Sequence, residues 1–170
     1  GRKVTATDVK WSFDRAVSVG GFPTVQMKAG GLVRPDQFIA VDDETFVIKL
    51  DRASKLTIPD LAVPVPYVIN SVEALANATA DDPWAMEYLH KTPAGSGAYK
   101  VARWTPGEQL VYQRNDDWVG GDLPAIQRIV IREVPSPATR RALVERGDVQ
   151  VAFDIPDKDA AELADSGDGF

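Results

Sequence analysis

One serine lies between two glycines near the middle of the sequence, in Gly95-Ser96-Gly97, and the chain has a single histidine, His90. A serine nucleophile needs a base such as histidine, and the Gly-x-Ser-x-Gly hydrolases place it at a turn from a strand into a helix. Here a β-like alternation begins at Tyr99 directly after the serine. The spacing therefore argues against a serine hydrolase, and against a dinucleotide site, because no helix follows the glycines.

Adjacent carboxylates occur at Asp42-Asp43, Asp81-Asp82 and Asp116-Asp117. All three pairs lie in segments of turn character, where aspartate accepts hydrogen bonds from nearby backbone amides. The donor spacing of a calcium loop is missing. The chain has no cysteine, and its one histidine has no second histidine with which to share a metal. The residues thus predict no catalytic carboxylate pair, no metal site and no cofactor.

The charge balance of the 170 residues is acidic, with 19 Lys and Arg against 25 Asp and Glu and a formal net charge of −6. Such a surface repels phosphate backbones, so nucleic acid is a poor default partner. No apolar run approaches the ~18 residues of a membrane span, and the N-terminal residues lack the apolar stretch of a signal peptide. Because no methionine precedes the first helix signal, we expect a segment of a longer chain.

The first elements are predicted to be a helix and a loop. Thr5 and Asp8 have the spacing of a capping box. Apolar side chains recur on one helical stripe at Val9, Phe13, Ala16 and Val17. Glycines at 20 and 21 end this helix. Residues 22–35 are rich in glycine and proline, so they are expected to form an irregular loop or one short helical turn.

A hairpin with strands at 38–41 and 45–50 is predicted next. The apolar run 58–69 contains prolines at 59, 64 and 66, which favour an extended segment; it could line a cleft or form a domain edge, and the residues leave both alternatives open. Asn70 and Asp82 have the features of helix N-caps, so a short helix is expected after each.

The second half of the sequence predicts a further hairpin, with strands at 98–104 and 109–114 joined by a type II turn at Pro106-Gly107. A strand at 126–131, a helix at 136–147 and a strand at 149–153 then predict a βαβ unit with parallel strands. A last helix is expected at 157–164. The elements together indicate an α+β protein.

Several stretches resemble the family 5 extracellular solute-binding proteins, the dipeptide, oligopeptide and nickel receptors of ABC importers. Residues 4–15 resemble the start of a family helix, residues 93–100 the family's Gly-Thr-Gly-Pro-Tyr segment, and residues 114–121 its Arg-Asn-x-x-Tyr-Trp segment. Residues 139–151 are similar to its Ala-Leu-x-x-Gly-x-x-Asp ending. The order of these stretches is that of the family across nearly the whole chain.

The sequence departs from the family pattern at three positions. Ser96 and Ala98 replace the usual threonine and proline, and Gln150 stands where the family often has aspartate. The glycines and the tyrosine of the segment remain. The resemblance implies that Gly95, Ser96, Gly97 and Tyr99 form a junction between two domains.

The implied fold is mixed α/β, periplasmic-binding-protein-like type II: a two-lobed receptor that closes on its ligand like a hinge. Residues 1–91 would form an additional α+β domain, and residues 92–170 part of the first ligand-binding lobe. The opposing lobe would lie outside this segment. We therefore expect the isolated segment to bind solute poorly, since closure cannot bury the ligand.

The implied function is non-covalent binding of a peptide or similar small solute outside the cytoplasm, in the periplasm or at the cell surface, for delivery to the membrane permease of an ABC importer. The expected cleft wall is Met27, Pro64, Val65, Pro66 and Tyr67. Nickel-type members can carry arginine near position 65, and Val65 has no charge, which disfavours an anionic metal chelate. Two alternatives remain open: the ligand-sensing domain of a transcription regulator with the same fold, and a hydrolase.

Overall fold

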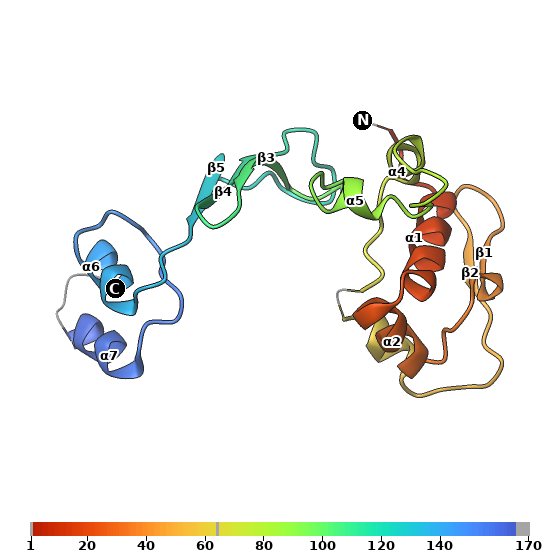
Figure 1. Cartoon of the computed structure of the whole chain (residues 1–170), viewed down its shortest axis with the longest axis horizontal. Coiled ribbons are helices and arrows are strands. Elements are labelled where there is room, and N and C mark those ends of the chain that lie inside the picture. Colours follow the sequence, from red (N-terminus) through yellow and green to blue (C-terminus); the bar gives the residue numbers. More distant parts are fainter. Residues whose placement is uncertain (1, 64, 166–170) are drawn as a thin grey trace. The chain divides into compact units, whose positions relative to one another are not determined.

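The computed structural model of the chain describes residues 2–63 and 65–165. Packing divides the chain into two compact units. One comprises Gly1–Lys100 with Arg114–Gln127, and the other comprises Val101–Gln113 with Arg128–Phe170. Figure 1 labels their elements in chain order. No helix among those described is both long and apolar enough to cross a membrane.

The first helix, α1 (Ala6–Ser18), begins as the capping box predicts. The Thr5 amide donates to Asp8 Oδ2 at 3.0 Å, which satisfies one of the amides that have no partner within the helix. The predicted apolar stripe is buried at Phe13, Ala16 and Val17. After the helix the chain turns at Gly20, where φ is +77° and a residue without Cβ is favoured.

The second helix, α2 (Gly21–Ala29), occupies most of the predicted loop, so that prediction was wrong. Pro23 is compatible with it because the amides of a first helical turn have no intrahelical partner to lose. The helix ends at Gly30. A short 3₁₀ helix, η1 (Pro35–Gln37), follows.

The predicted hairpin is confirmed as β1 (Phe38–Ala40) and β2 (Phe46–Ile48), antiparallel with Phe38 opposite Ile48. Its apolar face meets α1, and the Phe13 ring lies 5.3 Å from that of Phe38 and 5.1 Å from that of Phe46, centroid to centroid. The buried core of this unit is Phe13, Ala16, Val17, Met27, Leu32 and Phe38.

Helix α3 (Thr57–Leu61) replaces the first part of the segment predicted to be extended. Pro59 again lies in a first turn, where its missing amide leaves no bond unmade. Thr57 Oγ1 donates to Gly30 O at 2.6 Å, and a Cβ on Gly30 would lie 3.3 Å from Thr57 Cα. Glycine at 30 therefore permits a close approach between the end of α2 and the start of α3.

Two short helices follow, α4 (Ser71–Ala76) and α5 (Met86–Leu89). The Asn70 side chain caps α4, as predicted. Asp82 was expected to be the N-cap of the next helix, but α5 begins only at Met86, after Ala85 with φ +48°. The Asp82 carboxylate still accepts from the amide of Met86 at 2.8 Å. Asp82 thus accepts a hydrogen bond from the start of the helix, as a cap residue does, but the helix begins later than predicted.

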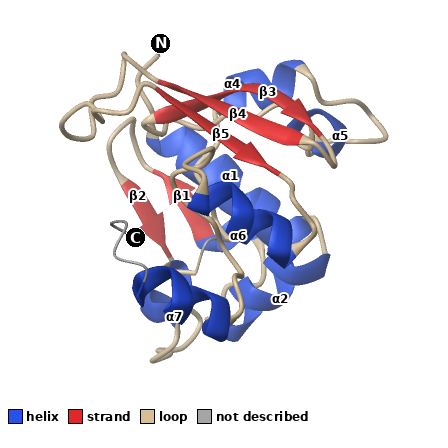
Figure 2. Cartoon of the chain, turned by 90° about the vertical axis from the view of Figure 1, so that its left-hand side faces the viewer, coloured by secondary structure: helices blue, strands red, loops and turns tan. Residues whose placement is uncertain are grey.

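The three-stranded sheet has the order β3-β4-β5 and consists of β3 (Tyr99–Thr105), β4 (Gln109–Arg114) and β5 (Arg128–Arg132). Figure 2 shows it as three labelled arrows. The predicted turn is present, with the Glu108 amide donating to Thr105 O at 3.1 Å and Gly107 at φ +75°. Strand β5 pairs antiparallel with β4, Val130 opposite Val111.

Helices α6 (Pro137–Glu145) and α7 (Asp157–Asp165) were both predicted as helices from the sequence, and they belong to the second unit. Ser136 caps α6 by accepting from the Thr139 amide at 3.3 Å. Arg141 Nη1 joins the two helices by donating to Asp159 at 2.7 Å and Glu162 at 2.6 Å.

The predicted βαβ unit is not formed within the described residues, so that prediction was wrong. Residues 149–153 have no strand assignment, and β5 pairs with the antiparallel β4. A strand needs a neighbour to accept and donate its ladder hydrogen bonds. The alternating pattern was read as β-like, but residues 149–153 form no strand, and bends occur at Gln150 and Phe153.

The packing units also differ from the predicted domains 1–91 and 92–170. The chain passes from one unit to the other within β3, at Lys100 and Val101, and residues 114–127 return to the first unit. Packing within this chain does not test where the domains of a longer protein would divide. The boundary after residue 91 remains a prediction.

Candidate functional site

The residues predicted to line a cleft belong to the first unit, but their exposure differs. Met27 is 2% exposed and lies in the core, so its side chain faces packed neighbours. Val65 is half-buried and packs against that core, and Pro66 is also half-buried. Tyr67 is 65% exposed. Pro64 lies outside the described residues. Of the described members, Tyr67 is the one that presents most of its side chain to solvent.

Tyr67 is followed by a well-anchored backbone. Two residues later, the Ile69 amide donates to Ser12 Oγ at 2.9 Å, and that hydroxyl donates to Asp8 O at 2.7 Å inside α1. The Asn70 amide donates to Ala94 O at 2.9 Å. Backbone anchored at residues 69 and 70 leaves less main-chain freedom near Tyr67 to be lost when a ligand binds.

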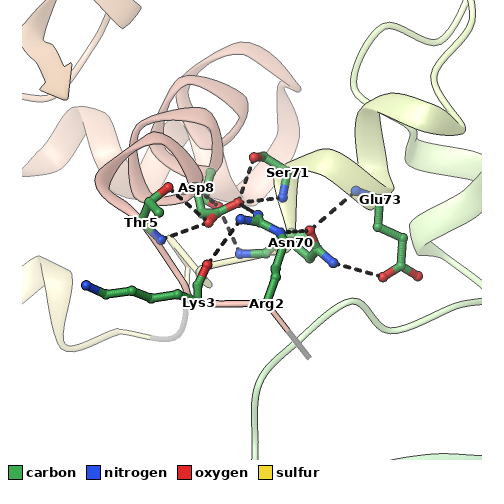
Figure 3. Close-up of polar contacts among 9 residues, drawn as sticks. Arg2, Lys3, Thr5, Asp8, Asn70, Ser71 and Glu73 are labelled. Atoms are coloured by element: carbon green, nitrogen blue, oxygen red, sulfur yellow. Dashed lines mark hydrogen bonds and ion pairs between the residues drawn. The ribbon is translucent and has the colours of Figure 1, made fainter. Parts of the chain in front are cut away.

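The anchor continues into a buried carboxylate, Asp8, which is 1% exposed. Figure 3 shows Thr5, Ser71 and Arg2 around it. Asp8 Oδ1 accepts from the Ser71 amide at 2.9 Å and from the Ser71 hydroxyl at 2.7 Å, and it forms an ion pair with the Arg2 guanidinium. Oδ2 accepts from the Thr5 amide at 3.0 Å. These donors tie the start of α1 to the start of α4.

The environment of Asp8 decides its charge. Burial by itself raises the pKa of a carboxyl, because it disfavours the charged form. Hydrogen bonds from Ser71, Thr5 and Arg2 outweigh that effect and lower the pKa of Asp8 to about 2. A group that stays ionised far below neutral pH is poorly matched to general-base catalysis. Asp8 therefore acts as an anchor of the fold.

The Gly-Ser-Gly junction is held from both sides by asparagine. The backbone amide of Asn70 donates to Ala94 O, just before the junction. On the other side, Asn115 Nδ2 donates to Gly97 O at 3.0 Å, and the Asn115 backbone amide donates to Ala98 O at 2.8 Å. Asn115 is 8% exposed. The hydroxyl of Tyr99 donates to Ile126 O at 2.8 Å. The junction is thus tied to both flanking segments, and a hinge role for it stays a prediction.

The two glycines of the junction do not need their conformational freedom in this chain. Neither Gly95 nor Gly97 has positive φ. A Cβ on Gly95 would meet nothing within 4 Å, and a Cβ on Gly97 would lie 3.8 Å from the nearest atom, Tyr99 O. Neither a left-handed backbone nor a close approach of neighbouring atoms therefore requires glycine at these two positions.

Two of the residues weighed for catalysis, Ser96 and Asp42, lie at the surface. Asp42 accepts from the amides of Glu44 at 2.9 Å and Thr45 at 2.7 Å, as expected of a turn aspartate. Across residues 2–63 and 65–165, no three His, Asp or Glu side chains are grouped to hold a metal ion.

Three buried polar residues of this region were not predicted: Ser12, Ser71 and Asn115. Ser71 meets Asp8 across 63 positions of sequence, so no local spacing could reveal the contact. Asn115 lies within the stretch that carries the family resemblance, which was the one available signal. Its amide contacts with the junction appear only in three dimensions.

Comparison with known proteins places these features in a family. The model of the bacterial extracellular solute-binding proteins, family 5 Middle, matches residues 1–169. The chain is 30% identical to the probable D,D-dipeptide-binding periplasmic protein DdpA of Escherichia coli over 156 residues, 92% of this chain and 28% of that protein. It is 27% identical to the glutathione-binding protein GsiB of Pectobacterium atrosepticum, over 96% of this chain and 30% of that protein.

Solved structures match the fold. The periplasmic binding protein AgaA of A. tumefaciens R10, in complex with agropinic acid, superposes with a TM-score of 0.80 at 26% identity, over 97% of this chain and 31% of that chain. DppA of Helicobacter pylori, in complex with the peptide STSA, gives 0.81 at 19% identity, over 96% and 33%. The chain thus spans about a third or less of the proteins it matches, and its fold is that of a part of them.

Proposed function

Because the chain belongs to the family 5 bacterial extracellular solute-binding proteins, we propose that it is part of a receptor that binds a peptide or a similar small solute without covalent chemistry. The receptor would act outside the cytoplasm and deliver its solute to the permease of an ABC importer. The match of the family model over residues 1–169 carries this proposal. Two relatives named for D,D-dipeptide and glutathione binding support a peptide-like solute.

The wall that this chain contributes is centred on Tyr67. Its ring is 65% exposed and is followed by backbone bonded to α1. Aromatic side chains suit peptide ligands, because the ring packs on apolar groups while the hydroxyl can donate or accept a hydrogen bond. Val65 and Pro66 continue this wall, together with Pro64, which lies outside the described residues. Met27 supports it from within the core.

The uncharged character of this wall favours a solute held here by apolar packing. No Lys, Arg, Asp or Glu occurs between residues 61 and 69. The charged ends of a peptide would then be recognised by other parts of the receptor, outside this segment. The junction of Gly95, Ser96, Gly97 and Tyr99 would connect residues 1–91 with the lobe to which residues 92–170 belong.

Calorimetry on the full-length parent protein tests this proposal. We expect binding of a di- or tripeptide from a mixed library, and we expect Tyr67→Ala to weaken it about tenfold, the effect of removing one well-packed aromatic contact. Phe22→Ala is the matched control, since Phe22 belongs to the same unit and is 64% exposed. Equal loss from both variants would contradict the assignment of Tyr67, and absence of binding to any peptide would contradict the solute class.

A further inference from the structure

Helix α1 holds the chain that follows the proposed cleft wall. The Ile69 amide donates to Ser12 Oγ at 2.9 Å, and the Ser71 amide donates to Asp8 Oδ1 at 2.9 Å. Both acceptors belong to α1. Among the described residues, Ile69 is the first after Tyr67 whose amide is anchored in this way. The bond to Ser12 is therefore the anchor nearest to Tyr67 on its C-terminal side.

The Ser12 hydroxyl is itself held in one orientation. Ser12 is 3% exposed, and its hydroxyl donates to Asp8 O at 2.7 Å, one turn earlier in the helix. A serine hydroxyl has a single hydrogen to donate, so its oxygen is left as an acceptor for the Ile69 amide. The helix thus presents a fixed acceptor to a residue 57 positions later in the sequence.

The backbone around Tyr67 is restrained from two sides. Before it, Val65 packs against the core cluster, and after it, Ile69 is bonded to Ser12. The Tyr67 side chain between these restraints is 65% exposed, so its own packing fixes it little. Without the bond to Ser12, the backbone from Tyr67 to Ile69 would gain freedom. A ligand would then have to restore that order when it binds, at a cost in conformational entropy.

We propose that Ser12 is a positioning residue of the solute site: its hydroxyl holds Ile69, and through Ile69 it sets the place of Tyr67. This inference rests on the proposed function, because it takes Tyr67 to contact the solute. Ser12 is buried and acts on the solute only through the wall that it positions. Removal of its hydroxyl therefore weakens binding without removing any contact to the solute.

A double-mutant cycle on the full-length parent tests this role, with the tightest-binding member of a dipeptide and tripeptide library as the probe. Ser12→Ala should weaken binding about fivefold, the size of one net hydrogen bond. In a Tyr67→Ala background the same change should weaken binding less than about 1.5-fold, because the residue that Ser12 positions is gone. Ser18→Ala, at an exposed serine of the same helix, is the control and should leave affinity unchanged. Equal losses in the two backgrounds, as a merely structural role would give, would overturn the proposal.

Hydrogen exchange of the parent without added solute separates this inference from the proposed function. We expect the Ile69 amide to exchange at least about tenfold more slowly in the wild type than in Ser12→Ala. Ser12→Thr keeps a hydroxyl that can accept from this amide, so it should retain the protection. An Ile69 amide that exchanges equally fast in the wild type and in Ser12→Ala would overturn the proposal. A protected Ile69 in a wild type that binds no peptide would show instead that the proposed function fails while Ser12 still holds the wall.

Discussion

The two units of this chain differ in how their buried apolar side chains are arranged. The first has a core cluster of six buried residues, among them Phe13, Met27 and Phe38, and adds a buried polar cluster around Asp8. The second buries Val111, Leu143, Val144 and Leu163, none of which belongs to that core cluster. Exposure of large apolar side chains does not separate the units, since Val119 in the first is 95% exposed and Phe153 in the second is 74% exposed. The contrast lies in the connected core of the first unit.

Truncation in the two cores gives the largest expected contrast. Phe38 is 1% exposed and packs edge-on against the Phe13 ring, so Phe38→Ala should cost about 3 to 5 kcal/mol of unfolding free energy. Leu143→Ala in the second unit should cost about 2 kcal/mol, the low end for such a change, because Leu143 is 9% exposed and lies outside the core cluster. Urea titration of the chain measures both. Equal costs would contradict the difference between the two units.

The Asp8 cluster gives the next effect. Asp8→Asn keeps the shape but removes the charge that accepts from Ser71, Thr5 and Arg2, so we expect a loss of about 2 kcal/mol at pH 7. Asp36→Asn is the control, since Asp36 is an exposed surface residue. A loss no larger than that of the control would show that the cluster does not stabilise the first unit.

The same cluster predicts an acid-sensitive stability. The pKa of Asp8 in the folded chain is about 2, below the ordinary value of 3.8, so its contribution is present above about pH 4 and is lost as pH falls toward 2. Thermal unfolding between pH 5 and pH 2 should show this loss in the wild type. The Asp8→Asn variant should lack that component of the pH dependence. An identical dependence in both proteins would contradict the lowered pKa.

Glycine positions give the smallest effects and compare two segments of the first unit, one around Gly95 and one around Gly30. Gly95→Ala should change stability by less than about 0.5 kcal/mol, because the added Cβ meets nothing within 4 Å. Gly30→Ala should cost about 1 kcal/mol or more, because its Cβ would lie 3.3 Å from Thr57 Cα and 3.2 Å from Asp60 Oδ2. Thermal melts of the two variants measure both stability losses. A larger loss at Gly95 than at Gly30 would contradict the geometry of the junction.

Local signals predicted much of the fold. The capping residues Thr5, Asn70 and Ser136 marked true helix starts, and both hairpins were predicted. The loop predicted at 22–35 failed because Pro23 was treated as a breaker, although a first helical turn accepts proline. The strand predicted at 149–153 failed for a different reason: alternation describes one strand, while a sheet requires its partner.

The candidate site was less predictable than the fold. Tyr67, in a proline-rich apolar run, was named as a cleft-wall residue from the family resemblance, and its side chain is 65% exposed. The backbone bond from Ile69 to Ser12 and the contact of Ser71 with Asp8 join residues 57 and 63 positions apart. Such contacts depend on how α1 and α4 pack, which no short motif encodes. Whether Tyr67 contacts a solute remains part of the proposal.

Native mass spectrometry of the full-length parent, purified without added ligand, tests the receptor assignment most directly. The account predicts a species heavier than the polypeptide by the mass of a peptide or similar small solute, which is released intact on denaturation because binding is non-covalent. A parent that carries no small solute and instead retains duplex DNA would contradict the account in favour of a regulator. Release of a peptide cleaved by the parent would contradict it in favour of a hydrolase.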